Sequence, residues 1–259
     1  MAEQKTVILD AGHGGNDPGA SYRGRKEKDD TWKLTLAVGR ILVEAGARVL
    51  YTRVDDSYDT PFEKARIVNQ SEADYLVSLH RNSAQTPGSE SGVESLVFEN
   101  SKAAALLAEN INTALQEVGY INLGVTERPG MALLRRTRMP AVQVEVGFID
   151  NDEDNQLFDQ KFQETAGAIA KGVKETMEQE DASRPEYYQV QVGAFKEKEN
   201  GMQVADHLRN QGFPAFLVHE DGYYKVRVGA FLSLDHAARM EQSLRNMGYP
   251  TMIVLKEAI

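Results

Sequence analysis

Hydrophobic and polar positions follow two alternating rhythms in the first part of the chain. Apolar runs at Val7–Asp10, Arg48–Thr52 and Asp74–His80 have the length of buried strands. Between the first two runs, apolar residues recur with helical spacing, at Leu34, Val38, Ile41, Leu42 and Ala45. This order predicts repeated βαβ units.

The same rhythm continues to about residue 178. Thr60 and Pro61 suit the N-cap and first position of one helix, and Ser101 and Gly119 suit the start and end of another. Strands are predicted at 92–98 and in AVQVEVGF after Met139-Pro140, and a last helical region follows from 151 to about 178. We therefore predict an α/β fold, a mostly parallel twisted sheet flanked by helices on both faces.

A second, smaller domain follows a charged stretch without apolar periodicity, MEQEDASRPE. After it, YYQVQVGAF from Tyr187 returns as YYKVRVGAF from Tyr223, and Gly-Phe-Pro at 212 returns as Gly-Tyr-Pro at 248 with the same offset. Each copy reads strand, helix, glycine turn, strand. The prediction is a ferredoxin-like α+β domain, βαββαβ, with the chain divided into a first domain 1–178, a linker 179–185 and a second domain 186–259.

Strand parity assigns the side chains of this repeat to two faces, because alternate side chains point to opposite sides of a strand. The helix-covered side should hold Tyr188, Val190, Val192, Tyr224, Val226 and Val228. The open side should hold Tyr187, Gln189, Gln191, Tyr223, Lys225 and Arg227. These outward residues form either an ordinary solvated surface or a binding face.

Composition narrows the functional classes. The 259 residues are 41% hydrophobic, enough for a sizeable core, and the net charge of −10 gives no general attraction to nucleic acid or anionic lipid. No run approaches the roughly 18 apolar residues of a spanning helix, and MAEQKTVILD has no signal-peptide pattern. Without cysteine, any metal must be bound by His, Asp or Glu.

The stretch DAGHGGNDPGA places His13 among glycines directly after the first strand. It could be a phosphate loop, a metal site or an ordinary tight connection, but no GK[ST] follows, which disfavours the phosphate loop. His80 and Glu145 also lie at or near strand ends, and ligands in open α/β sheets gather at the carboxyl ends of strands. Two histidines and a carboxylate form a His₂Glu zinc set, for which Glu27 in RGRKEKDD is the third candidate.

Glu145 is unusual because it interrupts an apolar strand, where an ionised carboxylate is costly without a metal, a catalytic use or a basic partner. Pairing with Arg135, Arg136 or Arg138 would be a purely structural explanation. Asp150, Asp152 and Asp154 have calcium-loop spacing but lack the required glycine and final carboxylate, so helix capping explains them better. No metal pattern surrounds the remaining histidines, which are His207, His219 and His236.

Four segments in order resemble the zinc-dependent N-acetylmuramoyl-L-alanine amidase family of cell-wall hydrolases, over residues 5 to about 175: DAGHGGNDPGA, the EKD at Glu27, SLHRNS and TRMPAVQVEVGFIDNDED. The resemblance implies that His13, Glu27 and His80 bind Zn²⁺ and that Glu145 is the general base and then the proton donor. The bond cut would join the lactyl group of N-acetylmuramic acid to L-alanine.

The second domain resembles the sporulation-related (SPOR) repeat that binds peptidoglycan glycans. Peptidoglycan is then the partner of both domains, and we expect a monomer acting at the bacterial cell wall, reached by lysis, by non-classical export or with a leader missing from this sequence. Gly12, Gly14 and Gly15 would let the backbone bring His13 inward. The nearly direct passage from Phe98 to Ser101 leaves no room for the occluding helix found in some family members, and Arg81 is atypical for its position.

Two alternatives stay open at this level. One is a non-catalytic peptidoglycan-binding protein on an inactive amidase fold, which the filled metal and base positions disfavour. The other is a metal-dependent peptidase acting within the stem peptide, which product analysis would distinguish.

Overall fold

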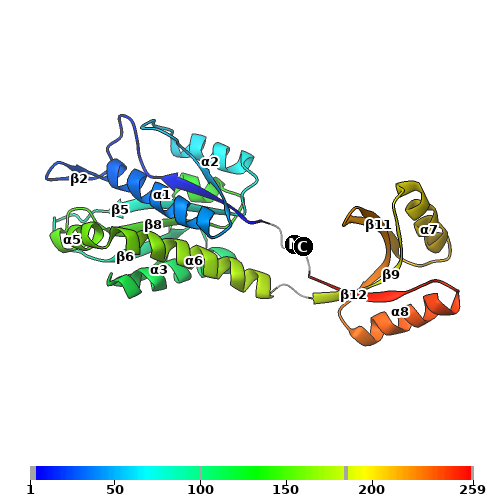
Figure 1. The fold of residues 1–259 in the computed structure, drawn as a ribbon. Coiled ribbons are helices and arrows are strands. Elements are labelled where there is room, and N and C mark those ends of the chain that lie inside the picture. Colours follow the sequence, from blue (N-terminus) through cyan, green and yellow to red (C-terminus); the bar gives the residue numbers. More distant parts are fainter. Residues whose placement is uncertain (1–3, 100, 184–185, 258–259) are drawn as a thin grey trace. The chain divides into compact units, whose positions relative to one another are not determined.

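The computed structural model describes residues 4–99, 101–183 and 186–257, and the chain divides into two compact units, 1–179 and 180–259 (Figure 1). The sheet of the first unit has the order β4-β1-β5-β8-β6-β7. Its strands are β1 (Thr6–Ala11), β4 (Arg48–Tyr51), β5 (Tyr75–Asn82), β6 (Val93–Val97), β7 (Asn122–Glu127) and β8 (Ala141–Phe148). β4, β1, β5 and β8 run parallel to one another. β6 is antiparallel to β8, and β7 is parallel to β6. The mostly parallel sheet is confirmed.

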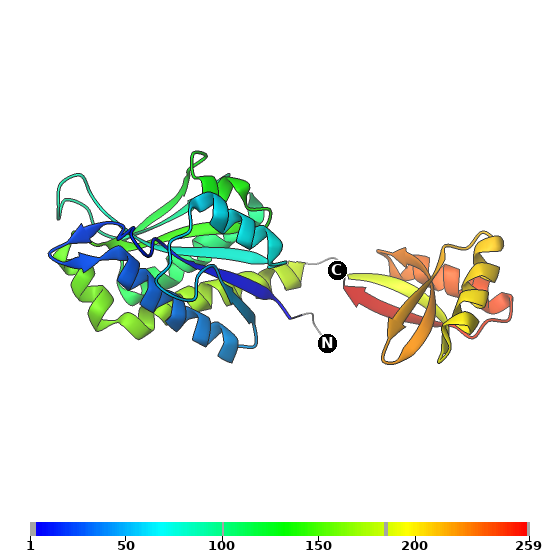
Figure 2. The same cartoon turned by 90° about the horizontal axis from the view of Figure 1, so that it is seen from above.

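Helices cover both faces of this sheet. One face packs against α1 (Glu27–Glu44), α3 (Lys102–Val118), α5 (Asp152–Gln160) and α6 (Phe162–Ser183). The other packs against α2 (Pro61–Gln70) and α4 (Ala132–Arg136). In Figure 2 the blue helix α1 and the cyan helix α2 lie on opposite sides of the sheet.

Two predicted caps have the expected local chemistry. Thr60 forms a capping box with Glu63 ahead of Pro61. The Ser101 side chain accepts a hydrogen bond from the backbone N–H of Ala104, and Gly119 ends that helix with a φ of 126°. β6 ends at Val97 and α3 begins at Lys102, so no helix lies between them among the described residues.

Several elements differ from the sequence predictions. The last helical region is two helices, α5 and α6, and α6 continues to Ser183, so the expected linker is helical over 179–183. Residues 184–185 lie outside the described part. The short hairpin of β2 (Ser21–Tyr22) and β3 (Arg25–Lys26), the strand β7 and the helix α4 had no predicted counterpart. No described helix is both long enough and apolar enough to cross a membrane.

The second unit has the predicted βαββαβ order. Its antiparallel sheet, β10-β11-β9-β12, consists of β9 (Glu186–Phe195), β10 (Ala215–Glu220), β11 (Tyr223–Phe231) and β12 (Met252–Glu257). The helices α7 (Lys198–Asn210) and α8 (Leu234–Asn246) contribute to a single core with the sheet. The four predicted core valines are all buried there: Val190, Val192, Val226 and Val228.

The open face of this sheet needs one correction. Gln189 and Arg227 are expected to face outward, but the two residues are only 5% and 3% exposed. Arg227 pairs with the Glu220 carboxylate and donates to the Gln189 amide oxygen at 3.2 Å, and Lys225 and Lys256 also pair with Glu220. Both side chains thus have polar partners within the sheet, Gln189 through Arg227 and Arg227 through Gln189 and Glu220.

Candidate metal centre

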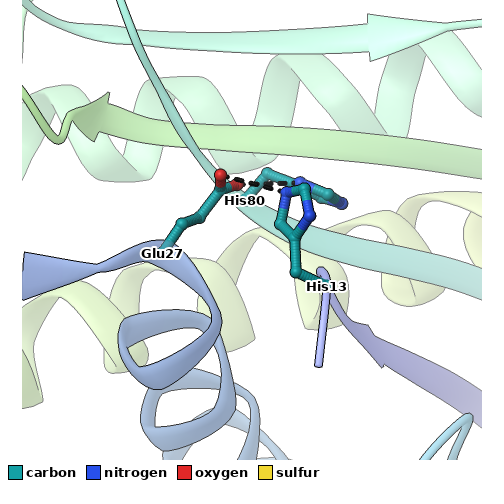
Figure 3. A group of neighbouring side chains, drawn as sticks. All are labelled: His13, Glu27 and His80. Carbon is teal, nitrogen blue, oxygen red and sulfur yellow. Dashed lines mark hydrogen bonds and ion pairs between the residues drawn. The ribbon is translucent and has the colours of Figure 1, made fainter. Parts of the chain in front are cut away.

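Three side chains from three separate segments meet at the carboxyl ends of β1 and β5. His13 Nε2 lies 3.0 Å from Glu27 Oε2, and His80 Nδ1 lies 2.9 Å from Glu27 Oε1. Figure 3 shows the carboxylate facing both rings, whose centroids are 5.0 Å apart. The structure thus brings together the three residues that the sequence suggested as metal ligands.

The backbone around His13 is shaped for this approach. His13 itself has a φ of 62°, a left-handed conformation rare outside glycine, and its Nδ1 is 2.8 Å from Asp17 Oδ2. Of the three glycines around it, Gly14 and Gly15 have positive φ values, of 135° and 53°, whereas Gly12 does not. A Cβ at Gly12 would lie 2.5 Å from the His80 ring, so the glycine is required by close approach.

Glu27 is the first residue of α1 and is only 3% exposed, although it lies in the charged run RGRKEKDD. The backbone N–H of Ala20 donates to its Oε2 at 2.9 Å, and the N–H of Arg81 donates to its Oε1 at 3.0 Å. Burial raises the pKa of Glu27, but the hydrogen bonds and charges of His13 and His80 outweigh it, so the pKa is well below the usual value. Glu27 is therefore held as a carboxylate.

His13 shows the complementary effect. Burial lowers its pKa, but Glu27 and Asp17 outweigh burial and raise the pKa to about 9. With this pKa the ring is protonated at neutral pH in the absence of a metal, and its Nε2 proton faces the Glu27 carboxylate. A metal ion bound by His13 would take the place of that proton, so metal uptake would release it.

The donor set fits zinc. One nitrogen from each histidine and one carboxylate oxygen all lie within 4.8 Å of one another. Two imidazoles and one carboxylate form the three-ligand zinc set that leaves a fourth position for water or substrate, and the hydrogen bond to Asp17 would orient the His13 ring.

Glu145 lies beside this centre on β8. It is the direct partner of His80 in the ladder between β5 and β8, and it is 8% exposed. Burial raises its pKa above the usual value. The Gln143 amide donates to its Oε1 at 2.7 Å. No described ion pair joins Glu145 to an arginine. The three candidate partners, Arg135, Arg136 and Arg138, are all exposed. Pairing with an arginine therefore does not explain the buried carboxylate.

A pocket of about 240 Å³ opens against this site. Its polar wall includes His13, His80 and Gln143, and its apolar wall comes from α4 and the residue before it. The residues of this apolar wall are Met131, Ala132 and Leu133. The remaining lining residues are Asp10, Asp17, Tyr58, Asp59, Pro61 and Lys64. A substrate in this pocket would lie beside the candidate metal ligands.

Sequence reasoning missed Asp17 and Gln143. Asp17 follows His13 by four residues inside the quoted motif, so its proximity could have been inferred. Gln143 shares a strand face with Glu145 and is the other polar residue of an apolar strand, a signal that parity offers.

Other candidates prove structural. The fully buried Arg81 guanidinium pairs with Asp30, donates to the Asn155 side chain and lies 4.3 Å from the centre of the Phe158 ring, so it does not face substrate. The three aspartates do not converge on a calcium site. Asp150 accepts from the N–H of Ala84, Asp152 pairs with Arg23, Asp154 accepts from the N–H of Phe148, and Asn151 caps α5.

Comparison with known proteins decides the family. The family model for N-acetylmuramoyl-L-alanine amidases matches residues 7–175, and the SPOR domain model matches residues 185–255. The chain belongs to the N-acetylmuramoyl-L-alanine amidase family. It is accordingly a hydrolase, and the non-catalytic alternative is not favoured.

Relatives extend over both units. The sporulation-specific N-acetylmuramoyl-L-alanine amidase of Bacillus subtilis (strain 168) is 32% identical over 221 residues, 83% of this chain and 85% of the relative. The N-acetylmuramoyl-L-alanine amidase CwlM of Bacillus licheniformis is 30% identical, with the same coverage of both chains.

Solved structures resemble the first unit. An N-acetylmuramoyl-L-alanine amidase from Clostridium difficile 630 aligns with a TM-score of 0.65 and 28% identity, covering 68% of this chain and 97% of that one. The catalytic domain of CwlV from Bacillus (Paenibacillus) polymyxa var. colistinus aligns with a TM-score of 0.63 and 29% identity, covering 68% and 99%. The predicted fold class is thereby confirmed.

Proposed function

We propose that the first unit hydrolyses the amide between the lactyl group of N-acetylmuramic acid and L-alanine, with zinc held by His13, Glu27 and His80 and with Glu145 as general base. The observation that carries the proposal is the position of Glu145. A buried carboxylate with a raised pKa stands in register with one candidate metal ligand, beside a pocket that both histidines line.

A zinc ion held by these residues supplies Lewis-acid chemistry, polarising a carbonyl oxygen and acidifying a water molecule. Glu145, as a carboxylate, takes a proton from the water that attacks the scissile carbonyl carbon. It then gives that proton to the nitrogen as the C–N bond breaks, so the products are a carboxylic acid and the free amine of L-alanine. Gln143 orients Glu145 during both transfers, and Asp17 fixes the ring of His13.

The second unit serves as the peptidoglycan-binding part, and we propose that it binds glycan strands on the open face of its sheet. By strand parity Tyr187 and Tyr223 offer aromatic surfaces on that face, and Gln191 of β9 and Lys225 of β11 share the face with them. Gln189 and Arg227 support the face from within through their hydrogen bond. We further propose that the protein works as a monomer at the bacterial cell wall.

Digestion of purified peptidoglycan with and without a zinc chelator tests the catalytic proposal. New amino termini of L-alanine that disappear with chelator and return with Zn²⁺ are expected. New termini inside the stem peptide would instead identify a peptidase, and no new termini with added Zn²⁺ would favour a non-catalytic wall-binding protein.

Removal of residues 186–259 tests the role of the second unit. We expect weaker sedimentation with cell walls and nearly unchanged turnover of small soluble muropeptides, because a tethered module raises local substrate concentration only. Undiminished wall binding by the shortened chain would contradict this role.

A further inference from the structure

A second depression, which we call the arginine groove, runs along α2 and α4 and has a volume of about 490 Å³. It is distinct from the catalytic pocket, with which it shares no lining residue. Its lining consists of Phe62, Ala65, Arg66, Asn69, Gln70, Arg136 and Arg138.

The groove is held in shape by contacts between its two sides. The Asn69 amide of α2 donates to the backbone oxygen of Arg136 at 2.8 Å, and its oxygen accepts from the N–H of Arg138 at 3.0 Å. The Arg136 guanidinium lies 4.6 Å from the centre of the Phe62 ring, within the range of cation–π attraction. The backbone carrying two of the arginines is therefore fixed against α2.

The arginines of the groove form no ion pair with any described carboxylate. The chain has a net charge of −10, yet Arg66, Arg136 and Arg138 are exposed and none has a carboxylate oxygen within 4.0 Å in the described residues. Glu63 lies three residues before Arg66, whose charge helps to lower the pKa of Glu63, but the Glu63 carboxylate accepts hydrogen bonds from the backbone N–H and the hydroxyl of Thr60 and forms no described ion pair with Arg66. Three guanidinium groups are left available to an anion.

The same two helices connect the groove to the catalytic pocket. Pro61 and Lys64 of α2 and Leu133 of α4 line the pocket, and their neighbours in the chain, Phe62 and Ala65 of α2, line the groove together with Arg136 of α4. The two depressions therefore border the same two helices.

We propose that the arginine groove binds the carboxylates of the peptide half of the substrate. This inference rests on the proposed amidase function and specifies how that site selects its substrate. A peptide stem carries at least its terminal carboxylate, and the planar guanidinium fork matches carboxylate geometry with two parallel hydrogen bonds. The Gln70 amide offers a further donor and acceptor for a peptide backbone.

The test compares two soluble muropeptides, one with free carboxylates and one with every carboxylate amidated, at low ionic strength. For Arg136→Gln/Arg138→Gln we expect KM to rise about tenfold on the free-carboxylate substrate, with kcat within about twofold. KM on the amidated substrate should stay within about twofold. The matched control is Arg40→Gln, an exposed arginine on α1 whose only described partner is Gln163, and it should change neither KM.

Equal KM increases on the two substrates, or no increase on either, would overturn the inference. A groove that selects phosphate would also overturn the inference. In that case inorganic polyphosphate would inhibit the native chain but not the double variant, and the KM of the double variant on the free-carboxylate muropeptide would be unchanged. If the native chain cleaves neither muropeptide, binding of both to Glu145→Gln and to Glu145→Gln/Arg136→Gln/Arg138→Gln is measured by calorimetry. A tenfold loss confined to the free-carboxylate compound supports the groove even if the amidase function fails, and equal binding overturns it.

Discussion

Glu145 is the direct ladder partner of His80 on one side and of Glu94 on the other, so three titratable side chains form a row across β5, β8 and β6. The row lies at the end of the strands where His13 and Glu27 also gather. A strand ladder fixes neighbouring side chains more firmly than a loop does, so Glu145, the proposed base, keeps a constant distance from the candidate metal ligand.

Replacing the proposed base, Glu145, should nearly abolish turnover but leave the candidate metal centre intact. For Glu145→Gln we expect activity on soluble muropeptide to fall about 1,000-fold, because the amide cannot accept the proton. Zinc content, measured by atomic absorption, and thermal unfolding should match the native chain. A variant that keeps a tenth of native activity would rule out Glu145 as the base.

Gln143 should set the acidic side of the pH profile. Burial raises the pKa of Glu145, while the hydrogen bond from Gln143 lowers it, so Gln143→Leu should raise that pKa further. Because the ionised carboxylate is the form that accepts a proton, the acidic limb of kcat should move to higher pH, by about one unit. An unchanged limb would contradict this, and Gln160→Leu, at an exposed position on α5, serves as the control.

Close approach at Gly12 predicts a metal-binding defect from one methyl group. In Gly12→Ala the new Cβ would lie 2.5 Å from the His80 ring, so the ring must move and zinc affinity should fall about 10- to 100-fold. Gly167→Ala is the matched control, since a Cβ there meets nothing within 4 Å. Competition with a fluorescent chelator measures both. Equal affinities for the two variants would show that His80 tolerates displacement.

The sequence predicted those parts of the site that depend on strand ends. His13, His80 and Glu145 were found because polar residues at the ends of apolar strands are unusual. Glu27 was supported mainly by resemblance, because its burial depends on the loop before α1 folding back onto β5, which local pattern does not encode. Arg81 could not be interpreted, because its partners lie on α1 and α5, far away in the chain.

The elements that the sequence did not predict lack a clear pattern of apolar residues. β7 is short, half-exposed and interrupted by Gly124, so it lacks clear alternation. The sequence predicts a linker where α6 ends, because the apolar residues of MEQEDAS do not recur with helical spacing. The segment nevertheless contains several residues that favour helices, and it continues α6 to Ser183. In the second unit, strand parity correctly predicts the buried core valines. It gives no sign that Gln189 and Arg227 are also buried, because their burial accompanies the ion pairs that Glu220 forms with basic side chains of β11 and β12.

Arg81 should matter for stability rather than for chemistry. Its guanidinium is buried with Asp30 and Asn155, so Arg81→Met should lower the free energy of unfolding by about 2–4 kcal/mol, since it leaves buried polar groups without partners. Well below its unfolding temperature, the variant should keep a kcat within about threefold of the native value. Urea denaturation and muropeptide turnover measure the two effects. Lost activity with unchanged stability would instead place Arg81 in the catalytic machinery.

Glu220 should make the second unit sensitive to acid. The hydrogen bond from Arg227, together with Lys256, outweighs burial and lowers the pKa of Glu220 from 4.5 to about 2. A carboxylate with a lowered folded-state pKa stabilises the fold above its unfolded pKa, and this stability is lost as pH falls from about 4.5 to about 2. With solvent screening of a partly exposed group, the contribution is about 1–2 kcal/mol.

Glu220→Gln should therefore lower the stability of the second unit at pH 7 by that amount and flatten its dependence on pH between 4.5 and 2. Urea titrations of the full chain, followed by amide exchange in β10 and β11, report this unit separately from the first. Glu197→Gln, at an exposed residue without a described ion pair, should leave the acid dependence as it is in the native chain. If Glu220→Gln keeps the native dependence, the acid sensitivity arises from other carboxylates, and the ion pairs over the open face contribute little to its stability.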